Sequence, residues 1–390
     1  MSIQTASVPH AEAVVDLSAI TANARLLSAA AGAAGLMAVV KADGYGHGAA
    51  QAARAALAGG AIMIGVATLP EAVALRAAGI DAPIVAWLWA PGEDVHAAIE
   101  AGAQIVVSSR QQLRHVADAS AAAPATSDAR AGQVAVHVKV DTGMGRNGVI
   151  PAELPALLAD IAAAEQRGQV HMAGLMSHLA CADVPGDPSI AGQIRTFTEA
   201  IGLTERTGLN PRWRHLANTA ATLTLPAAHF NLVRCGIGLY GLSPLADRHG
   251  LVPAMTLRTR VALTKRVPAG QGVGYGLDYH TAAETTLALV PVGYGDGIPR
   301  IAGNRGEVLL AGKRRRLAGR VAMDQVVVDC GDDPVRAGDE VVVFGPGSAG
   351  EPTADDWAGY CDTINYEIVT RVAPRVARRY IAPRPAEQSR

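Results

Sequence analysis

The chain has 390 residues, of which 49% are apolar, so it is long enough for two domains and can bury a large core without disulfides or a metal. Its 34 basic and 35 acidic residues leave a formal net charge of −1, which gives no electrostatic reason to expect nucleic acid or an anionic membrane as a partner. The four cysteines form no C-x-x-C pair, so neither a zinc site nor a disulfide framework is indicated. Residues 1–10 are polar and no apolar run is long enough to span a bilayer, so a cytoplasmic protein is expected.

A repeating unit begins at Asp16: a short apolar run, a loop, and then an amphipathic segment rich in alanine and leucine. Most of the runs are continuous rather than alternating, as expected of parallel strands that are covered on both faces. The predicted strands are residues 36–40, 62–66, 84–88, 105–107, 134–140, 173–176, 215–217 and 232–235, and helical patterns fill gaps such as 48–57, 70–77, 111–117 and 153–165. These repeats predict an α/β domain, a (β/α)₈ TIM-type barrel over residues 11–241, with a doubly wound open sheet as the alternative.

The pattern changes after about Gly241. Segments 255–263, 285–292, 307–310, 321–329 and 340–344 are strand-like, with glycine, proline and aspartate between them. Only residues 354–361 have a helical pattern. Residues 242–385 are therefore expected to form a second, mainly β domain.

Lys41 directly follows the first predicted strand and opens a glycine-rich loop. Partial burial at such a position lowers the pKa of a lysine, which makes a neutral, nucleophilic amine available for a Schiff base. The competing interpretation is a lysine that extends from the strand end into solvent.

Other predicted strands also end in polar residues. The fifth runs into the stretch 139–146, the sixth ends near His178, the seventh continues to Thr219, and the eighth delivers Arg234 and the glycine-containing stretch 236–238. Exposed N–H groups after the eighth strand of a barrel often hold a phosphate. Individually, His178 could be a core histidine and Arg234 an ion-pair partner. Together these residues favour a phosphate-bearing cofactor bound to Lys41.

The sequence resembles the bacterial alanine racemases, a family of fold-type III pyridoxal-phosphate enzymes, over nearly its whole length. The matching segments occur in the family's order, at residues 14–20, 38–48, 139–148, 215–222, 234–239, 272–279, 291–297, 319–325 and 363–367. Three positions depart from the family pattern without removing a catalytic group: Thr219 replaces a commoner serine, and Gly274 and Ala322 replace serine and cysteine.

The resemblance implies that Lys41 carries pyridoxal 5'-phosphate covalently. The residues that match the family's phosphate ligands are Tyr45, Thr219, Gly236, Ile237 and Tyr366. Arg234 matches the residue that faces the pyridine nitrogen. Because an arginine does not give up its proton, that nitrogen should stay unprotonated and the ring should be a weaker electron sink.

Racemisation needs an acid or base on each face of the substrate. The resemblance assigns one face to Lys41 and the other to Tyr275, in the second domain. His178 and Arg234 match a hydrogen-bond network that assists this tyrosine. In the family the tyrosine comes from the partner subunit, so a homodimer with shared active sites is expected.

Arg146 and the backbone of Met323 match the groups that bind the substrate carboxylate. Lys139 matches a lysine that is carbamylated in many family members, and a carbamate would orient Arg146 where a cationic lysine would repel it. A lysine turned away from Arg146 is the alternative. The residues that match the substrate entrance are Asp183, Arg300, Arg320 and Ile364.

Alanine is the expected substrate. The two candidate roles are supply of D-alanine for cell-wall synthesis and breakdown of alanine. Racemisation of serine or of a broader set of amino acids is the alternative within the class. A non-catalytic pyridoxal-phosphate carrier is less consistent with the sequence, because a single-barrel carrier lacks the β domain and Tyr275. A dinucleotide site at residues 270–274 fails because no helix follows. No metal is expected.

Overall fold

The computed structural model describes residues 9–120 and 133–381, which divide into two compact units. The barrel unit comprises residues 20–44 and 49–251, and the β unit comprises the chain up to residue 19, residues 45–48 and the chain from residue 252. Most of the polar N-terminal stretch 1–10 lies outside the described residues, as do residues 382–385 at the end of the expected second domain.

The barrel unit contains an eight-stranded sheet in which every neighbouring pair is parallel. The sheet order is β8-β7-β6-β5-β4-β3-β2-β9. Its first and last strands are joined by hydrogen bonds from Asn231 N to Arg214 O (3.3 Å) and from Arg234 N to Ala217 O (2.9 Å), which close the sheet. The bounds are β2 Gly35–Val39, β3 Met63–Val66, β4 Ile84–Ala86, β5 Ala103–Val107, β6 Val134–Lys139, β7 Val170–Met176, β8 Trp213–His215 and β9 Leu232–Cys235. The eight predicted strands and the barrel are confirmed.

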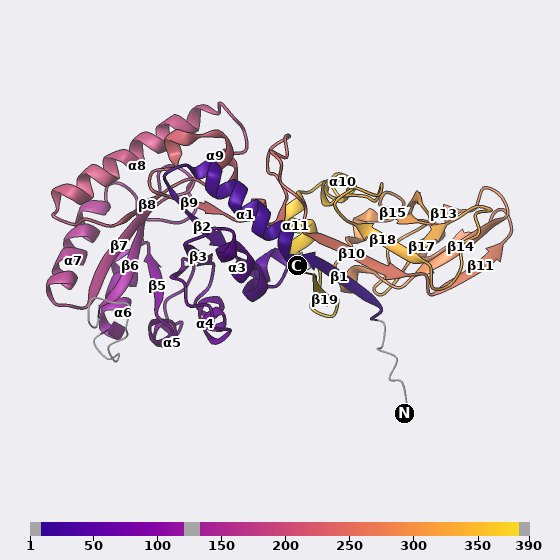
Figure 1. The fold of residues 1–390 in the computed structure, drawn as a ribbon, viewed down its shortest axis with the longest axis horizontal. Coiled ribbons are helices and arrows are strands. Elements are labelled where there is room, and N and C mark those ends of the chain that lie inside the picture. Colours follow the sequence, from indigo (N-terminus) through magenta and orange to yellow (C-terminus); the bar gives the residue numbers. More distant parts are fainter. Residues whose placement is uncertain (1–8, 121–132, 382–390) are drawn as a thin grey trace, which may run out of the picture. The chain divides into compact units, whose positions relative to one another are not determined.

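Helices surround this sheet, as Figure 1 shows for α4 to α8. They are α1 Leu17–Ala31, α3 Ala49–Ala58, α4 Leu69–Ala77, α5 Val95–Glu100, α6 Arg110–Ser120, α7 Leu154–Gln166, α8 Pro188–Arg206 and α9 Thr219–Thr224. Because the helices cover the outer face and side chains fill the inside, every residue of β3 and β4 is buried. This burial explains the continuous apolar runs in the sequence. Inside the sheet a cluster contains Met37, Met63, Val85, Val106, Met176 and Leu232.

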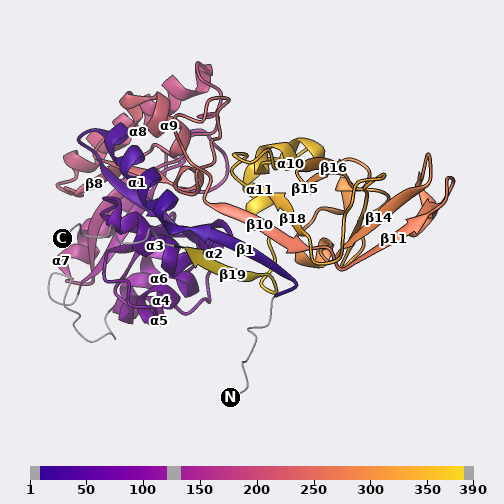
Figure 2. The ribbon, with the colours of Figure 1, turned by 45° about the vertical axis from the view of Figure 1, so that its right-hand side comes forward.

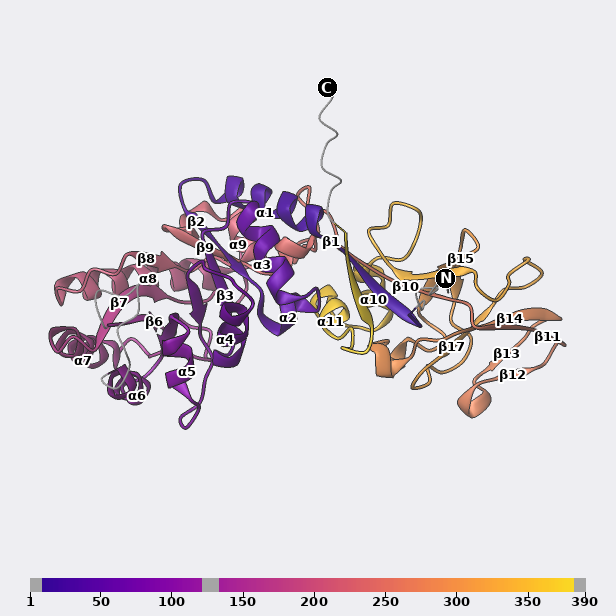
Figure 3. The same ribbon diagram turned by 60° about the horizontal axis from the view of Figure 1, so that its bottom comes forward.

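The β unit is built on a six-stranded sheet of order β16-β15-β18-β10-β1-β19, beside a three-stranded sheet, β11-β14-β17, and a β12-β13 hairpin. Figure 3 shows β11, β14 and β17 close to that hairpin. The bounds are β1 Ala11–Asp16, β10 Met255–Arg260, β11 Leu263–Val267, β12 Gly272–Val273, β13 Tyr279–His280, β14 Thr285–Val290, β15 Glu307–Leu310, β16 Lys313–Arg316, β17 Val326–Asp329, β18 Glu340–Phe344 and β19 Ala377–Ile381. The mainly β character of the C-terminal part is confirmed.

The first strand of the chain belongs to this second sheet. β1 pairs antiparallel with β10 and parallel with β19 (Figure 2). The expected barrel range, 11–241, contains β1, whereas the structure pairs this strand within the β unit. β1, near the start of the chain, therefore lies between two strands, β10 and β19, that come from its C-terminal part.

Three expectations for the C-terminal part were wrong in detail. The predicted strand 255–263 is two strands, because β10 and β11 belong to different sheets. The predicted strand 321–329 begins only at Val326. A second helix, α11 Asn365–Thr370, follows α10 Ala354–Tyr360, where only one was expected. With six residues, α11 is too short to show a repeated helical pattern.

Among the described residues, no helix is both long enough and apolar enough to cross a membrane.

Candidate active site

Lys41 opens a left-handed turn, labelled α2 (Lys41–Tyr45), at the end of the first barrel strand. Ala42, Asp43 and Tyr45 have φ angles of 51°, 52° and 53°, a conformation that costs roughly 1–2 kcal/mol per residue for L-amino acids. The Ala42 N–H donates to Oε1 of Glu71 at 2.6 Å, which helps to hold the turn. Strain of this kind persists only where surrounding bonds enforce it, and it is common at functional sites.

Glu71 was not singled out from the sequence. Its Oε2 accepts hydrogen bonds from the N–H groups of Ala67 (2.9 Å) and Thr68 (3.0 Å) at the start of α4, while Oε1 holds the Lys41 turn. The spacing Thr68-x-x-Glu71 is a capping-box signature that could have identified it. One carboxylate thus fixes both the start of α4 and the turn that carries Lys41.

The pKa of Lys41 is lowered, chiefly by burial and then by the positive charges of Arg146 and Arg234, while Glu71 acts in the opposite direction. Its amine therefore loses its proton more easily than that of an exposed lysine. This is the electrostatic setting expected of a lysine that forms a covalent bond through its neutral amine.

Lys139 lies at the end of β6 and is only 6% exposed. Burial, followed by the charges of Arg234 and Arg146, lowers its pKa to about 8. The loop after β6 is held by Asp141, whose carboxylate accepts the N–H groups of residues 143–145. This loop carries the exposed side chain of Arg146. The barrel unit thus brings Lys41, Lys139, Arg146 and Arg234 close enough to interact electrostatically.

Arg234, on β9, is a buried cation held by neutral groups. Its Nη1 donates to His215 O (2.7 Å), and its Nη2 donates to Ser177 O (2.6 Å) and to Nδ1 of His178 (3.1 Å). No carboxylate of the described chain forms an ion pair with it. Burial lowers its pKa to about 10, so it stays positively charged at neutral pH.

A buried chain of side chains continues from Arg234 across the barrel. Nη1 of Arg234 lies 3.2 Å from Nδ1 of His215, Nε2 of His215 lies 2.9 Å from Nδ1 of His137, and Nε2 of His137 lies 2.7 Å from Oε1 of Gln104. Arginine only donates and an amide oxygen only accepts, so both histidines accept at Nδ1 and donate from Nε2. Burial lowers the pKa of His137 to about 3 and that of His215 well below its usual value, so both rings are neutral.

The sequence analysis did not identify Gln104, His137 and His215 as a network. The available signal was positional: His137 precedes Lys139 by two residues on β6, so both side chains are on the same face of the strand.

Thr219 and the stretch after β9 form a small group of donors. Thr219 is 3% exposed, and its Oγ1 accepts the N–H groups of Gly236 (3.3 Å) and Gly238 (3.4 Å). The Ile237 N–H donates to no described residue. A Cβ at Gly238 would lie 2.7 Å from Cγ2 of Thr219, so only glycine allows this approach. A hydroxyl and backbone N–H groups in a tight turn suit an anionic phosphate.

The rings of Tyr45 and Tyr366 lie close together within the β unit. Their ring centroids are 6.2 Å apart with an interplanar angle of 52°. Tyr45 is 8% exposed and Tyr366, on α11, is half-buried. The helix that the sequence analysis missed therefore carries one of the residues it had singled out.

Tyr275 projects from a glycine turn in the β unit and is 73% exposed. It begins the short helix η3 (Tyr275–Leu277), between Gly274 and Gly276, which have φ angles of 68° and 78°. A Cβ at Gly276 would lie 2.7 Å from Cζ of Arg320, which forms an ion pair with Asp278 in the same turn.

Met323 also lies in the β unit and is 54% exposed. Of the residues expected at the substrate entrance, Asp183 is exposed in the barrel unit, Arg300 is exposed in the β unit, and Ile364 is 60% exposed just before α11. The site residues thus form two groups, one in each unit.

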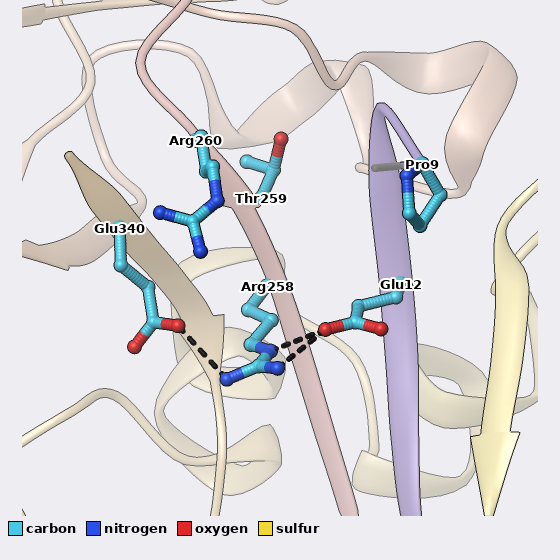
Figure 4. Close-up of a pocket in the computed structure, with 6 residues that line it drawn as sticks. All are labelled: Pro9, Glu12, Arg258, Thr259, Arg260 and Glu340. Carbon is cyan, nitrogen blue, oxygen red and sulfur yellow. Dashed lines mark hydrogen bonds and ion pairs between the residues drawn. The ribbon is translucent and has the colours of Figure 1, made fainter. Parts of the chain in front are cut away.

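A small pocket in the β unit does not contain these residues. Figure 4 shows Arg258 between two carboxylates, with Nε 2.7 Å from Oε1 of Glu12 and Nη1 2.8 Å from Oε2 of Glu340. Its central arginine is already paired on both sides, which leaves little reason for a charged ligand to bind there. Among the described residues no group of three or more His, Cys, Asp or Glu side chains is arranged to hold a metal ion.

Two family models match the chain: "Alanine racemase, N-terminal domain" over residues 15–244 and "Alanine racemase, C-terminal domain" over residues 254–380. The chain is 55% identical to the alanine racemase of Frankia casuarinae over 95% of its own length and 96% of the relative, and 53% identical to that of Thermobifida fusca over 95% and 98%. The crystal structure of alanine racemase from Streptomyces lavendulae matches with a TM-score of 0.92 and 50% identity, covering 96% of this chain and 98% of that one. This chain belongs to the alanine racemase family.

Proposed function

We propose that this chain interconverts L-alanine and D-alanine, using pyridoxal 5'-phosphate bound to Lys41. The observation that carries the proposal is the setting of Lys41: a half-buried lysine with a lowered pKa, held by a strained turn at the end of a barrel strand. The relatives from Frankia casuarinae and Thermobifida fusca, named alanine racemases, support alanine as the substrate.

The residues present fit the cofactor. Its phosphate would be held by the hydroxyls of Thr219, Tyr45 and Tyr366 and by the backbone N–H groups of Ile237 and Gly236, the latter shared with Thr219 Oγ1. In the barrel unit, Thr219 Oγ1 is already oriented by the Gly236 and Gly238 N–H groups. When bound, pyridoxal phosphate withdraws electrons from the α-carbon of the amino acid and makes its α-proton acidic.

Arg234 would lie against the pyridine nitrogen and limit this electron withdrawal. Its contacts are three carbonyls and two imidazole nitrogens, all of them acceptors. It is a fixed cation with no proton to transfer at neutral pH, so it leaves the ring nitrogen unprotonated. In this way Arg234 would favour prompt return of the α-proton over slower side reactions.

Two bases move the proton. The neutral amine of Lys41 takes the proton from, or returns it to, one face of the α-carbon, and the phenol oxygen of Tyr275 does the same on the other face. Arg146 and the Met323 N–H bind the substrate carboxylate and so hold the substrate in one orientation between the two bases. Lys139, if carbamylated, orients Arg146.

The active site is completed by a second copy of the chain. Tyr275 is 73% exposed, and other large apolar side chains of the β unit, including Leu277, Ile301 and Ile364, are more than half exposed. A catalytic phenol in such an exposed turn needs a partner surface to exclude water. Mixing an inactive Lys41→Ala protein with an inactive Tyr275→Phe protein should restore activity, because each heterodimer has one intact site. Absence of recovery after verified subunit exchange would contradict shared sites.

Serine or a wider set of amino acids is the second candidate substrate class, but no observation in the structure favours it. A non-catalytic carrier is opposed by the second domain, which matches the family's C-terminal model. The division of the chain near residue 241 and the cytoplasmic location remain predictions.

The deciding experiment measures D/L conversion of a panel of amino acids with added pyridoxal phosphate. Conversion of alanine well above serine, lysine and arginine is expected. Borohydride reduction followed by peptide mapping should label Lys41 and no other lysine. Absence of alanine conversion in a protein that has bound the cofactor would overturn the proposal.

A further inference from the structure

The peptide at Met323 is held by the turn Gly293–Gly297, a motif to which the proposed chemistry assigns no role. The Tyr294 N–H donates to Ala322 O at 3.0 Å, and the Gly295 N–H donates to Met323 O at 2.8 Å. Both carbonyls of the Ala322–Met323 pair are therefore engaged. The Met323 N–H, in contrast, donates to no described residue and remains available to a ligand.

The glycines of this turn allow backbone to pack directly on backbone. A Cβ at Gly293 would collide with the carbonyl oxygens of Ala322 and Met323, and a Cβ at Gly295 would lie 2.6 Å from Nη2 of Arg375. Side chains at these positions would force the Met323 peptide away. The turn is thus shaped to receive this peptide.

Asp296 anchors the turn. Its side chain is 0% exposed, and its Oδ2 accepts the Gly293 N–H at 2.8 Å. Arg375 binds both carboxylate oxygens, with Nε 2.7 Å from Oδ1 and Nη2 3.0 Å from Oδ2, and Nε2 of His10 lies 3.0 Å from Oδ1. A buried carboxylate with this many donors is firmly fixed.

Arg375 connects the anchored turn to the Met323 segment. Its Nη2 lies 2.8 Å from Oδ1 of Asp324 and 3.5 Å from Met323 O. The guanidinium therefore spans a buried carboxylate on the turn and an exposed carboxylate directly after Met323. The planar guanidinium fixes the distance between the two, which an ammonium could not do.

We infer that Asp296 and Arg375 are positioning residues that set the direction of the Met323 N–H, and hence the affinity of the site for the substrate carboxylate. The inference rests on the proposed function, in which that N–H binds the carboxylate. It predicts that weakening the Arg375 contacts impairs carboxylate binding more than it impairs proton transfer.

The test uses Arg375→Lys, which keeps the charge but loses the bidentate contact. The KM for both alanine enantiomers should rise about tenfold while kcat changes little, because the carboxylate contact is made equally before and during proton transfer. The dissociation constant of propionate, which has the carboxylate but no amine, should rise by the same factor. Binding of ethylamine, which has the amine but no carboxylate, should not change.

Arg266→Lys is the matched control. Arg266 is also an arginine of the β unit with several partners, binding Glu284 and Asp332 on other loops, and its replacement should leave propionate binding unchanged. If Arg375→Lys does not fold, Asp324→Asn decides the question, since it removes only the negative charge of the exposed partner and so weakens its contact with Arg375. It should weaken propionate binding about twofold to fivefold.

Unchanged propionate affinity in the folded Arg375→Lys protein, or in Asp324→Asn when that variant decides, would overturn the inference. Equal loss of propionate and ethylamine binding would also overturn it, because it would indicate general damage. These outcomes leave the proposed function intact when the unmodified protein racemises alanine. An unmodified protein that fails to do so would refute the proposed function instead.

Discussion

Nη2 of Arg234 donates to Nδ1 of His178 at 3.1 Å. Because an arginine has no acceptor, a neutral His178 must carry its proton on Nε2. Burial is the largest cause that holds the pKa of His178 well below its usual value, followed by the charge of Arg234, so the neutral form dominates at neutral pH. Arg234 thus sets the tautomer of His178 and makes Nε2 a hydrogen-bond donor.

This donor allows a test of the proposed assistance of Tyr275 by His178. In His178→Gln the side-chain amide can replace the Nε2 donor, whereas in His178→Asn it is too short and can replace only Nδ1. We expect His178→Gln to retain more racemase activity than His178→Asn, with a loss of about 10²-fold or more in the latter if the donor supports general-base catalysis. Steady-state kinetics in both directions would measure this. Equal losses in the two variants would show that the donor has no special role.

Gly174 on β7 should be needed for the His137 ring. A Cβ there would lie 2.5 Å from Cε1 of that ring and even closer to Nδ1, which accepts the hydrogen bond from His215. Gly174→Ala should therefore lower the free energy of unfolding by about 1–3 kcal/mol.

Gly192 provides the matched control for this substitution. It lies inside α8, where a Cβ would meet nothing closer than 3.8 Å, so Gly192→Ala should stabilise the protein by about 0.5–1 kcal/mol. Denaturant unfolding of both variants checks the opposite signs. A Gly174→Ala protein as stable as the parent would mean that the ring can move without cost.

Much of the barrel could be predicted from the sequence because its strands are buried on both faces and therefore appear as continuous apolar runs. Lys41, Lys139, His178, Thr219 and Arg234 could be proposed because each lies at or near the end of such a run. Their convergence then follows from the barrel itself.

Other features depend on contacts between distant segments and have no local pattern. Gln104, His137 and His215 lie on three different strands, and their network depends on the pairing of those strands. Asp296 and Arg375 likewise come from separate loops of the β unit. These contacts can be inferred from a single sequence only when the order of the strands in the sheet is already known.

Lys139 should be modified by carbon dioxide in a pH-dependent way. Its pKa is lowered to about 8, and only the neutral amine reacts, so about one-tenth is reactive at pH 7 and most of it above pH 9. At constant dissolved ¹³CO₂, a carbamate signal in the ¹³C NMR spectrum should grow as the pH rises through about 8 and should be absent in Lys139→Arg. Lys313, which is exposed and paired with Asp333, should form no carbamate and serves as the reference lysine. A signal that persists in Lys139→Arg would assign the modification elsewhere.

The two bases should serve different enantiomers. If Lys41 takes the proton from D-alanine and Tyr275 takes it from L-alanine, they act on opposite faces and neither replaces the other. Tyr275→Phe removes only the hydroxyl from a side chain that is 73% exposed, so folding and cofactor binding should persist. This variant should lose racemisation but still exchange the α-proton of D-alanine with solvent deuterium, because that exchange needs only Lys41. Exchange from L-alanine should fall by about 10²–10⁴-fold, the usual contribution of a general base. Mass spectrometry of each enantiomer after incubation measures both rates, and equal losses would leave Tyr275 as a residue that positions the substrate without moving its proton.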